Sequence, residues 1–237
     1  MSPSQPPLSA LPAPNDRDEE AAALHEYAVL RQRVDAFFAA VAARHPTALR
    51  CQAGCHGCCQ AGLSVCAIEA AAIRAHLRAL PRVEVEHLRA QAVRRLHHTK
   101  AARPAEPAAS CVFLRDDGHC AIYPVRPLVC RSQGLPLSYS AQLIPAQALR
   151  FSTQDGRAVV CCPLNFNQDT ASVDGQAAAL PQAADILDAE RVDLLLALLN
   201  RRFLERTGQD AAHATQRSAL ADLVRMPDDC APEPTQM

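Results

Sequence analysis

The chain has 237 residues, of which 49% are hydrophobic and 21% are charged, and its formal net charge is -1. This length and composition predict a globular protein with its own core, and the near-neutral charge argues against nonspecific binding to nucleic acid. With six Phe, three Tyr and no Trp, the chain also lacks the base-stacking platforms of single-strand binders. Eleven cysteines are many for a chain that keeps its thiols reduced, so the cysteines need an explanation.

Both ends of the chain are predicted to be disordered. Residues 1–16 are rich in proline and lack the basic and apolar segments of an exported leader, and residues 227–237 form a tail that contains Cys230. The longest apolar run, Leu194 to Leu199, is too short to cross a bilayer. We therefore expect a soluble, cytoplasmic protein with no membrane or nucleic-acid partner. In that reducing compartment, clustered cysteines favour a metal site over disulfides.

Hydrophobic spacing and turn signals divide the rest of the chain into helices and a cysteine-rich middle. Leu30, Val34 and Val41 recur at helical intervals, and Pro81 separates two further helices. Asp116-Asp117-Gly118 is a turn signal between two short apolar segments. In chain order, the expected elements are helices over 17–44, 67–80 and 84–98, a linker over 101–110, a small hairpin within 111–131, a strand pair around Phe151 and Val159-Val160, a largely buried helix over 183–206 and a final helix over 210–225.

The expected fold class is mostly α, with a small irregular β-hairpin or knuckle region. We expect a single domain over 17–226, in which a metal-binding cysteine core at 51–163 is carried by a helical scaffold at 17–44 and 183–226. One cysteine of this region, Cys66, lies at the start of a predicted helix, and we expect its side chain in the hydrophobic core.

The strongest chemical signal is a cluster of four cysteines within nine residues, Cys51, Cys55, Cys58 and Cys59, in the order C-x3-C-x2-C-C. A C-x2-C step lets two thiolates reach one ion from a tight turn, and the interleaved glycines permit such a turn. The neighbours Cys58 and Cys59 point in different directions in most backbone conformations. One of them is therefore free to serve a second site or to have another role.

Further cysteines follow at Cys111, Cys120 and Cys130 and at the pair Cys161-Cys162. The predicted hairpin carries Cys111 and Cys120 towards each other. Together with the first cluster and one cysteine of the late pair, they supply eight thiols, enough for two four-coordinate sites. Two zinc sites, or an iron–sulfur cluster with another metal, both satisfy this count, and the sequence does not choose between them.

Charged and imidazole side chains accompany the cysteines. Four thiolates around a divalent ion leave about two negative charges, which Arg50, Arg126 and Arg131 are placed to offset. His56 and His119 are alternative ligands, but eight thiols make them unnecessary. The chain contains no GxSxG, P-loop, GxGxxG or HExxH pattern, so no catalytic residue is identified.

These residues resemble the CxxCxxCC cysteine-cluster family of bacterial proteins, described as a zinc- or iron-chelating domain. The matching segments are CQAGCHGCC (51–59), CVFLRDDGHCAIYPVRPLVCR (111–131) and Cys162-Pro163. The sequence departs from the family at Val112, where proline is usual, and in the doubled Cys161-Cys162. The resemblance implies chelation by the cysteines, and we take Cys162 as the eighth candidate ligand. Flagellin lysine methylases look like longer relatives with a similar cluster, which implies an iron–sulfur-dependent enzyme as an alternative.

Three hypotheses follow. The first is a protein that binds zinc or iron, including iron as a 4Fe-4S cluster, through about eight cysteines. The second is an iron–sulfur-dependent enzyme or maturation factor that acts on a protein or peptide partner. The third is a redox-responsive thiol protein whose adjacent cysteines switch between dithiol and disulfide. The sequence leaves open whether the protein is an enzyme, which metal it takes and its oligomeric state.

Overall fold

A computed structural model describes residues 16–101, 110–144, 151–153, 155–167 and 180–225. The fold is mostly helical with small strand pairs, as the sequence predicts. Of the predicted arm, linker and tail, only residues 16, 101 and 110 are described, so Cys230 lies outside the described residues. The α-helices are α1 (Asp16–Arg44), α2 (Ala67–Ala79), α3 (Arg82–Ala101), α4 (Leu128–Ser132), α5 (Ala189–Arg206) and α6 (Leu220–Arg225). The strands are β1 (Ser64–Val65), β2 (Leu137–Tyr139), β3 (Phe151–Ser152), β4 (Ala158–Val160), β5 (Leu187–Asp188) and β6 (Ser218–Ala219).

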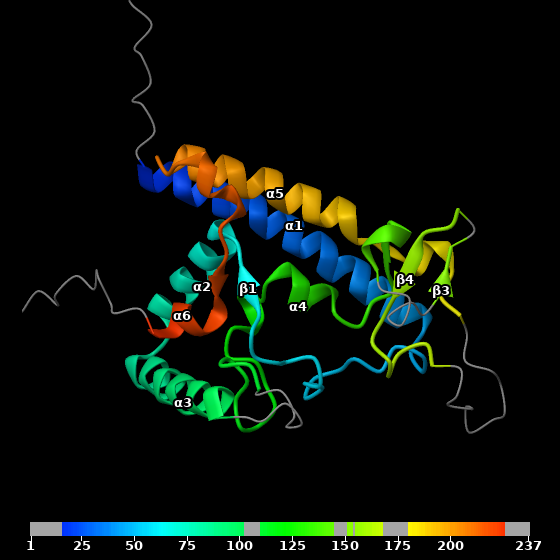
Figure 1. The fold of residues 1–237 in the computed structure, drawn as a ribbon, viewed down its shortest axis with the longest axis horizontal. Helices are drawn as coiled ribbons and strands as arrows, with labels where there is room; N and C mark the ends of the chain where they lie inside the picture. The colour runs from blue at the N-terminus through cyan, green and yellow to red at the C-terminus, as the bar shows by residue number, and fades with distance from the viewer. Residues whose placement is uncertain (1–15, 102–109, 145–150, 154, 168–179, 226–237) are drawn as a thin grey trace, which may run out of the picture.

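Two long helices, α1 and α5, lie side by side along the length of the molecule (Figure 1). The apolar residues of α1 recur at helical spacing and are buried, as predicted for 17–44. They pack with α2, with Leu128 of α4 and with Phe203 and Leu204 of α5 in one hydrophobic cluster. The short helix α4 therefore reaches the same core as the long pair.

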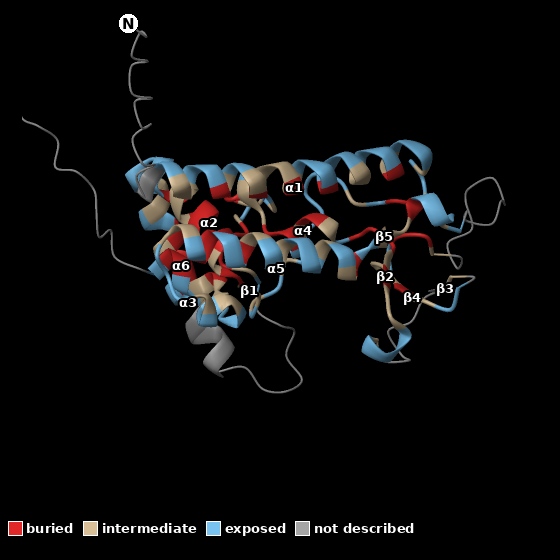
Figure 2. Cartoon of the chain, turned by 90° about the horizontal axis from the view of Figure 1, so that it is seen from above, coloured by how far each residue is buried: buried red, intermediate tan, exposed pale blue. Residues whose placement is uncertain are grey.

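A second hydrophobic cluster joins α2, α3 and α6 at one end of the molecule, and buried residues line the inner faces of these helices (Figure 2). Phe113 and Ile122, from the cysteine-rich segment, are buried in it. The helices predicted over 67–80 and 84–98 are confirmed within a few residues, since α2 ends before Pro81 and α3 begins after it. The cysteine-rich segment is thus anchored by its apolar residues to a helical core.

The strands form two small sheets. β3, β4, β2 and β5 form one sheet in that order, with β2–β4 and β3–β4 antiparallel and β2–β5 parallel. The predicted strand pair around Phe151 and Val159-Val160 is confirmed by β3 and β4. β1 and β6 pair antiparallel and connect the start of α2 to the start of α6.

The hairpin predicted within 111–131 does not form as a strand pair. Its turn is present, because Arg115 N donates to His119 O (2.8 Å) and Ala121 N donates to Phe113 O (2.8 Å). A single bridge between Leu114 and Cys120 replaces the ladder. The chain then enters a 3₁₀ turn, η1 (Tyr123–Val125), where Pro124 has no N–H to give to a sheet. The result is a knuckle without strands.

The helix predicted from 183 begins later than expected. Residues 183–185 form a 3₁₀ turn and β5 follows, and α5 starts after its N-cap Asp188, which accepts a hydrogen bond from Arg191 N. Leu187 N donates to Pro136 O, so pairing with β2 overrides the helical pattern. The prediction that this helix is largely buried is also wrong, because Leu194 and Leu198 are 60% and 50% exposed.

The final helix predicted over 210–225 is shorter than expected. The first part of this range forms a 3₁₀ turn, η5 (Ala211–Thr215), followed by β6. Within this range, only α6 is α-helical. Asp210 accepts a hydrogen bond from Ala212 N, and Asn200 Nδ2 donates to Ala214 O, so both polar side chains hold the turn in place. Among the described helices, none has both the length and the hydropathy of a membrane span.

Candidate metal centre

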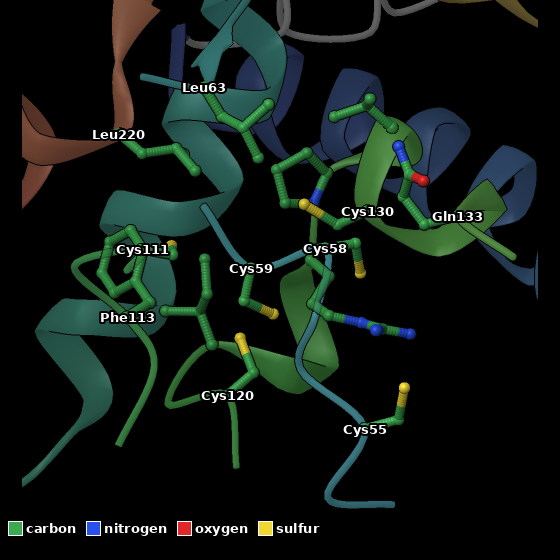
Figure 3. Close-up of a pocket in the computed structure, with 14 residues that line it drawn as sticks. Cys55, Cys58, Cys59, Leu63, Cys111, Phe113, Cys120, Cys130, Gln133 and Leu220 are labelled. Atoms are coloured by element: carbon green, nitrogen blue, oxygen red, sulfur yellow. The ribbon is translucent and has the colours of Figure 1, made fainter. Parts of the chain in front are cut away.

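Six cysteine thiols from separate parts of the chain line one pocket of about 70 Å³ (Figure 3). They are Cys55, Cys58, Cys59, Cys111, Cys120 and Cys130. The apolar side chains of Leu63, Phe113 and Leu220 form its other wall. The structure thus brings together six of the eight predicted ligands. The remaining two, Cys51 and Cys162, lie outside this pocket.

Backbone pairing brings Cys59 and the knuckle together. Cys111 N donates to Cys59 O (2.8 Å), and the next residues, Gln60 and Ser110, form an antiparallel bridge. The turn of the knuckle then returns the chain to Cys120, which is bridged to Leu114. Because these contacts are between main-chain atoms, they place the three sulfurs near one another without help from a metal.

The third segment that contributes a thiol to the pocket is α4, which carries Cys130. Its first N–H, on Leu128, donates to the carboxylate of Glu69 (3.0 Å), which is 2% exposed. The same carboxylate accepts hydrogen bonds from Tyr27 Oη (3.3 Å) and from Cys66 N (3.3 Å). Glu69 therefore ties α4 to α1 and α2 and positions Cys130.

Sequence reasoning missed the role of Glu69. The sequence did contain a signal for a capping role of Glu69. Cys66 is the N-cap of α2 and Glu69 follows it by three residues, and this is the spacing of a capping box. Cys66 itself is 4% exposed and belongs to the core, as predicted. Burial raises its pKa to about 12, so this thiol is kept protonated.

Burial opposes ionisation of the three pocket thiols that lie on the knuckle and on α4. It raises the pKa values of Cys111 and Cys120, and it raises that of Cys130 to about 12, with Cys111 and Cys120 adding to the shift. At Cys58 and Cys59 a hydrogen bond between the side chains is the main cause, since it raises the pKa of the donor Cys58 and lowers that of the acceptor Cys59. Cys59 is therefore the first thiol of this pair to ionise.

Arg126 contributes a positively charged side chain to this pocket. Its side chain lines the pocket, and its guanidinium lies 4.1 Å from the centre of the Tyr123 ring. The Nε–H of Arg126 is buried and has no hydrogen-bond partner among the described residues. A buried donor without a partner is costly, and a thiolate is a suitable acceptor for it.

The other two arginines singled out in the sequence do not line the pocket. Arg131 is buried, forms an ion pair with Asp35 of α1 and donates to the carbonyls of Arg126 and Pro124. Arg50 contributes its backbone N–H, which donates to Asn165. The alternative ligands His56 and His119 also lie outside the pocket lining: His56 Nδ1 is 2.8 Å from Gly54 O, and His119 lies beside Asp117.

Cys51 and Cys162 lie together at a neighbouring position. The fully buried Asn165 donates from Nδ2 to Cys51 Sγ (3.2 Å) and to Gly134 O (2.7 Å), and its Oδ1 accepts from Arg50 N (2.9 Å). Asn165 N donates to Cys162 O (2.9 Å). Burial raises the pKa of Cys51, and the nearby thiols of Cys162, Cys55 and Cys58 raise it further. Asn165 was not identified from the sequence.

The donor set fits zinc or iron. Both metals take four thiolates, and the pocket offers six sulfurs, an unpartnered Arg126 donor and an apolar wall. Within the described residues, no three His, Cys, Asp or Glu side chains are already arranged to hold one ion. Thiolates around zinc lie about 2.3 Å from the ion, so binding requires the thiols to move inwards as they lose their protons.

Comparison with known proteins agrees with this chemistry. No curated protein and no solved structure matches the chain, so the expected similarity to flagellin lysine methylases is not shown. One family model matches residues 50–149, which include seven of the eight candidate ligands, and Cys162 lies beyond the match. The matching model is that of the CxxCxxCC family, described as a "putative zinc- or iron-chelating domain", so residues 50–149 are similar to that domain.

Proposed function

We propose that the protein binds zinc or iron through its cysteines and that Cys59, Cys111, Cys120 and Cys130 hold the principal ion. The observation that carries this proposal is the convergence of thiols from three separate segments on one pocket beside the unpartnered Nε–H of Arg126. Such convergence is typical of structural metal sites, which join chain segments that share little core.

The residues of the pocket have different roles in the proposed metal binding. Cys59 loses its proton most easily, so it is the first anionic ligand, while the buried thiols ionise only as the cation approaches. Arg126 offsets the negative charge that four thiolates leave on a divalent ion. Phe113 and Ile122 bury the knuckle in the helical core and exclude water from one side. The metal, when bound, supplies the bonds that lock these segments together.

Anaerobic purification followed by metal analysis tests this proposal. The full chain is compared with the double variant Cys120→Ser/Cys130→Ser and with Cys161→Ser, which changes a thiol outside the pocket. We expect the double variant to lose at least one ion per chain and to melt at a lower temperature, and Cys161→Ser to retain the metal content. Equal metal content in all three proteins would contradict the proposal.

A second candidate function, an iron–sulfur-dependent enzyme that modifies a protein or peptide, is favoured by a groove beside the thiol pocket. The groove has a volume of about 460 Å³ and is lined by α4, α5 and β2, with Asp193 and Tyr139 among its polar side chains. Val129 and Gln133 line both the groove and the thiol pocket. A bound ligand would therefore be separated from Cys130 by the width of α4 alone.

Two measurements distinguish this candidate from simple chelation. Acid-labile sulfide and a broad visible absorption band in the anaerobic protein support it, since both are expected of thiolate-bound iron–sulfur clusters. A colourless protein without sulfide, loaded with zinc, excludes it.

A further inference from the structure

Three leucines on one face of α5 are exposed, and we call them the leucine face. Leu194, Leu195 and Leu198 are 60%, 38% and 50% exposed. The first two precede Leu198 by four and three residues, which places all three on one side of the helix. The other side of α5 carries Phe203 and Leu204, which are buried in the cluster shared with α1. In Figure 1, α5 lies at the edge of the molecule with α1 beneath it. Single exposed hydrophobic residues are normal, but neighbouring ones form an apolar patch of the kind that marks an interaction surface.

Charged residues of opposite sign lie beyond the two ends of the leucine face. Arg191 precedes Leu198 by seven residues and Glu205 follows it by seven, so all three lie close to one line along the helix. Arg191 is exposed, and among the described residues its side chain has no ion-pair partner. The side chain of Glu205 is 49% exposed and pairs with Arg201 of the same helix (2.8 Å). The leucine face therefore lies midway between an accessible guanidinium and an accessible carboxylate.

This arrangement of charges is complementary to itself. When two copies of α5 pack antiparallel about a two-fold axis at Leu198, Arg191 of each copy lies opposite Glu205 of the other copy. The same symmetry places Leu198 against its own counterpart. It also places Leu194 opposite Arg202 of the other copy, and the aliphatic stem of an arginine covers apolar surface while its guanidinium stays in water. The leucine face is thus buried and both exposed charges gain a partner.

The other symmetric arrangements of two such helices bring like charges together. A parallel pair places Arg191 opposite Arg191, and an antiparallel pair with its axis at Leu196 places Arg191 opposite Arg201, so both are repulsive. We propose that the leucine face is the interface of a symmetric homodimer, in which two copies of α5 pack antiparallel around Leu198 and Arg191 of each copy pairs with Glu205 of the other. No residue of α5 lines the thiol pocket, so this inference is independent of the proposed function. One helix pair buries a small area for a protein interface, and we therefore expect a dimer that dissociates at micromolar concentrations.

Sedimentation velocity of the full chain tests this inference. The chain concentration is varied from about 1 to 100 μM, and a reductant is present because exposed cysteines would otherwise cross-link the copies. We expect the wild type to form a dimer as the concentration rises. Leu194→Glu/Leu198→Glu, which places carboxylates of both copies in the interface, should remain a monomer throughout. Val83→Glu/Val93→Glu is the matched control and should dimerise like the wild type, since these valines are 74% and 47% exposed on α3, on the opposite side of the molecule from α5 (Figure 1).

An exchange of charges tests the antiparallel arrangement separately. Arg191→Glu and Glu205→Arg should each weaken dimerisation about tenfold, because attractive pairs become repulsive. The combined variant Arg191→Glu/Glu205→Arg restores both pairs with reversed polarity and should dimerise within about threefold of the wild type. If the urea midpoint shows that the leucine variant has lost its fold, the charge variants at these exposed positions decide the result alone.

Three results would overturn the inference. A wild type that stays monomeric at about 100 μM would assign the leucine face to a different partner. A folded leucine variant that still dimerises would place the interface elsewhere on the molecule. Single charge variants that dimerise like the wild type, or a combined variant as weak as the single ones, would exclude the pairing of Arg191 with Glu205.

Discussion

Replacing Glu69 by alanine tests whether this buried carboxylate positions α4, the helix that carries Cys130. In Glu69→Ala, the N–H groups of Leu128 and Cys66 and the hydroxyl of Tyr27 lose their acceptor. A buried donor without an acceptor costs about 1–3 kcal/mol, so three of them predict a loss of at least about 3 kcal/mol in the free energy of unfolding. For a chain of this size, that corresponds to a fall in Tm of roughly 6–12 °C.

The assay is urea unfolding of the full chain, once with a chelator and once with saturating zinc. Glu86→Ala is the control, because Glu86 is 56% exposed and pairs with Arg82 one turn away on the helix. We expect the control to lose no more than about 0.5 kcal/mol. Glu69→Ala should also bind zinc more weakly, since Leu128 lies two residues before Cys130. If Glu69→Ala and Glu86→Ala unfold within about 0.5 kcal/mol of each other in chelator, the reasoning is refuted.

Three further predictions concern a close contact, acid stability and metal affinity. In urea unfolding, Gly134→Ala should destabilise the protein by about 1–3 kcal/mol more than Gly156→Ala. Both glycines have a positive φ, but only a Cβ atom at Gly134 would collide with Cys51. Equal losses of stability in the two variants would contradict this contact. Burial opposes ionisation of Asp185, but hydrogen bonds from Gln182, Arg44 and His45 outweigh it and hold its pKa below the ordinary value. Its contribution to stability is therefore present above about pH 4 and is lost as the pH falls through the lowered pKa, so the urea midpoints of wild type and Asp185→Asn should differ most near neutrality and converge in acid. Because the pKa values of Cys111, Cys120 and Cys130 are raised, zinc must displace their protons, and the apparent affinity measured by competition should rise between about pH 6 and 8; a flat profile would exclude these thiols as ligands.

The parts of the fold that could be predicted are those determined by local spacing. The periodic apolar residues of α1 and the breaks around Pro81 specify three helices, because each signal acts within a few turns. The start of α5 could not be predicted, since Leu187 is held in β5 by a hydrogen bond to Pro136 from a distant segment. The exposure of Leu194 and Leu198 could not be predicted either. The sequence pattern shows which residues are hydrophobic but not which segments pack against them.

The candidate site shows the same division. Clustering in the sequence identifies the thiols, because metal ligands of this kind combine a rare residue type with characteristic spacing. The residues that orient them are common polar types at ordinary positions. Asn165 and Glu69 matter because the chain brings Cys51 to one and Leu128 to the other, over sequence separations of 114 and 59 residues. Only the three-dimensional structure shows these pairs.

The four cysteines proposed to hold the principal ion come from segments that are fixed to different degrees before any ion binds. α4 is fixed at both ends, since Leu128 N donates to Glu69 and Arg131 pairs with Asp35 of α1. The segment from 52 to 58 is exposed throughout, and its backbone hydrogen bonds are short-range, such as Cys55 N to Gln52 O. The knuckle and α4 thus present three thiols from a packed core, and the first cysteine cluster supplies ligands from the surface. An ion that binds both removes conformational freedom mainly from the cluster, so most of the ordering on binding falls on residues 51–59.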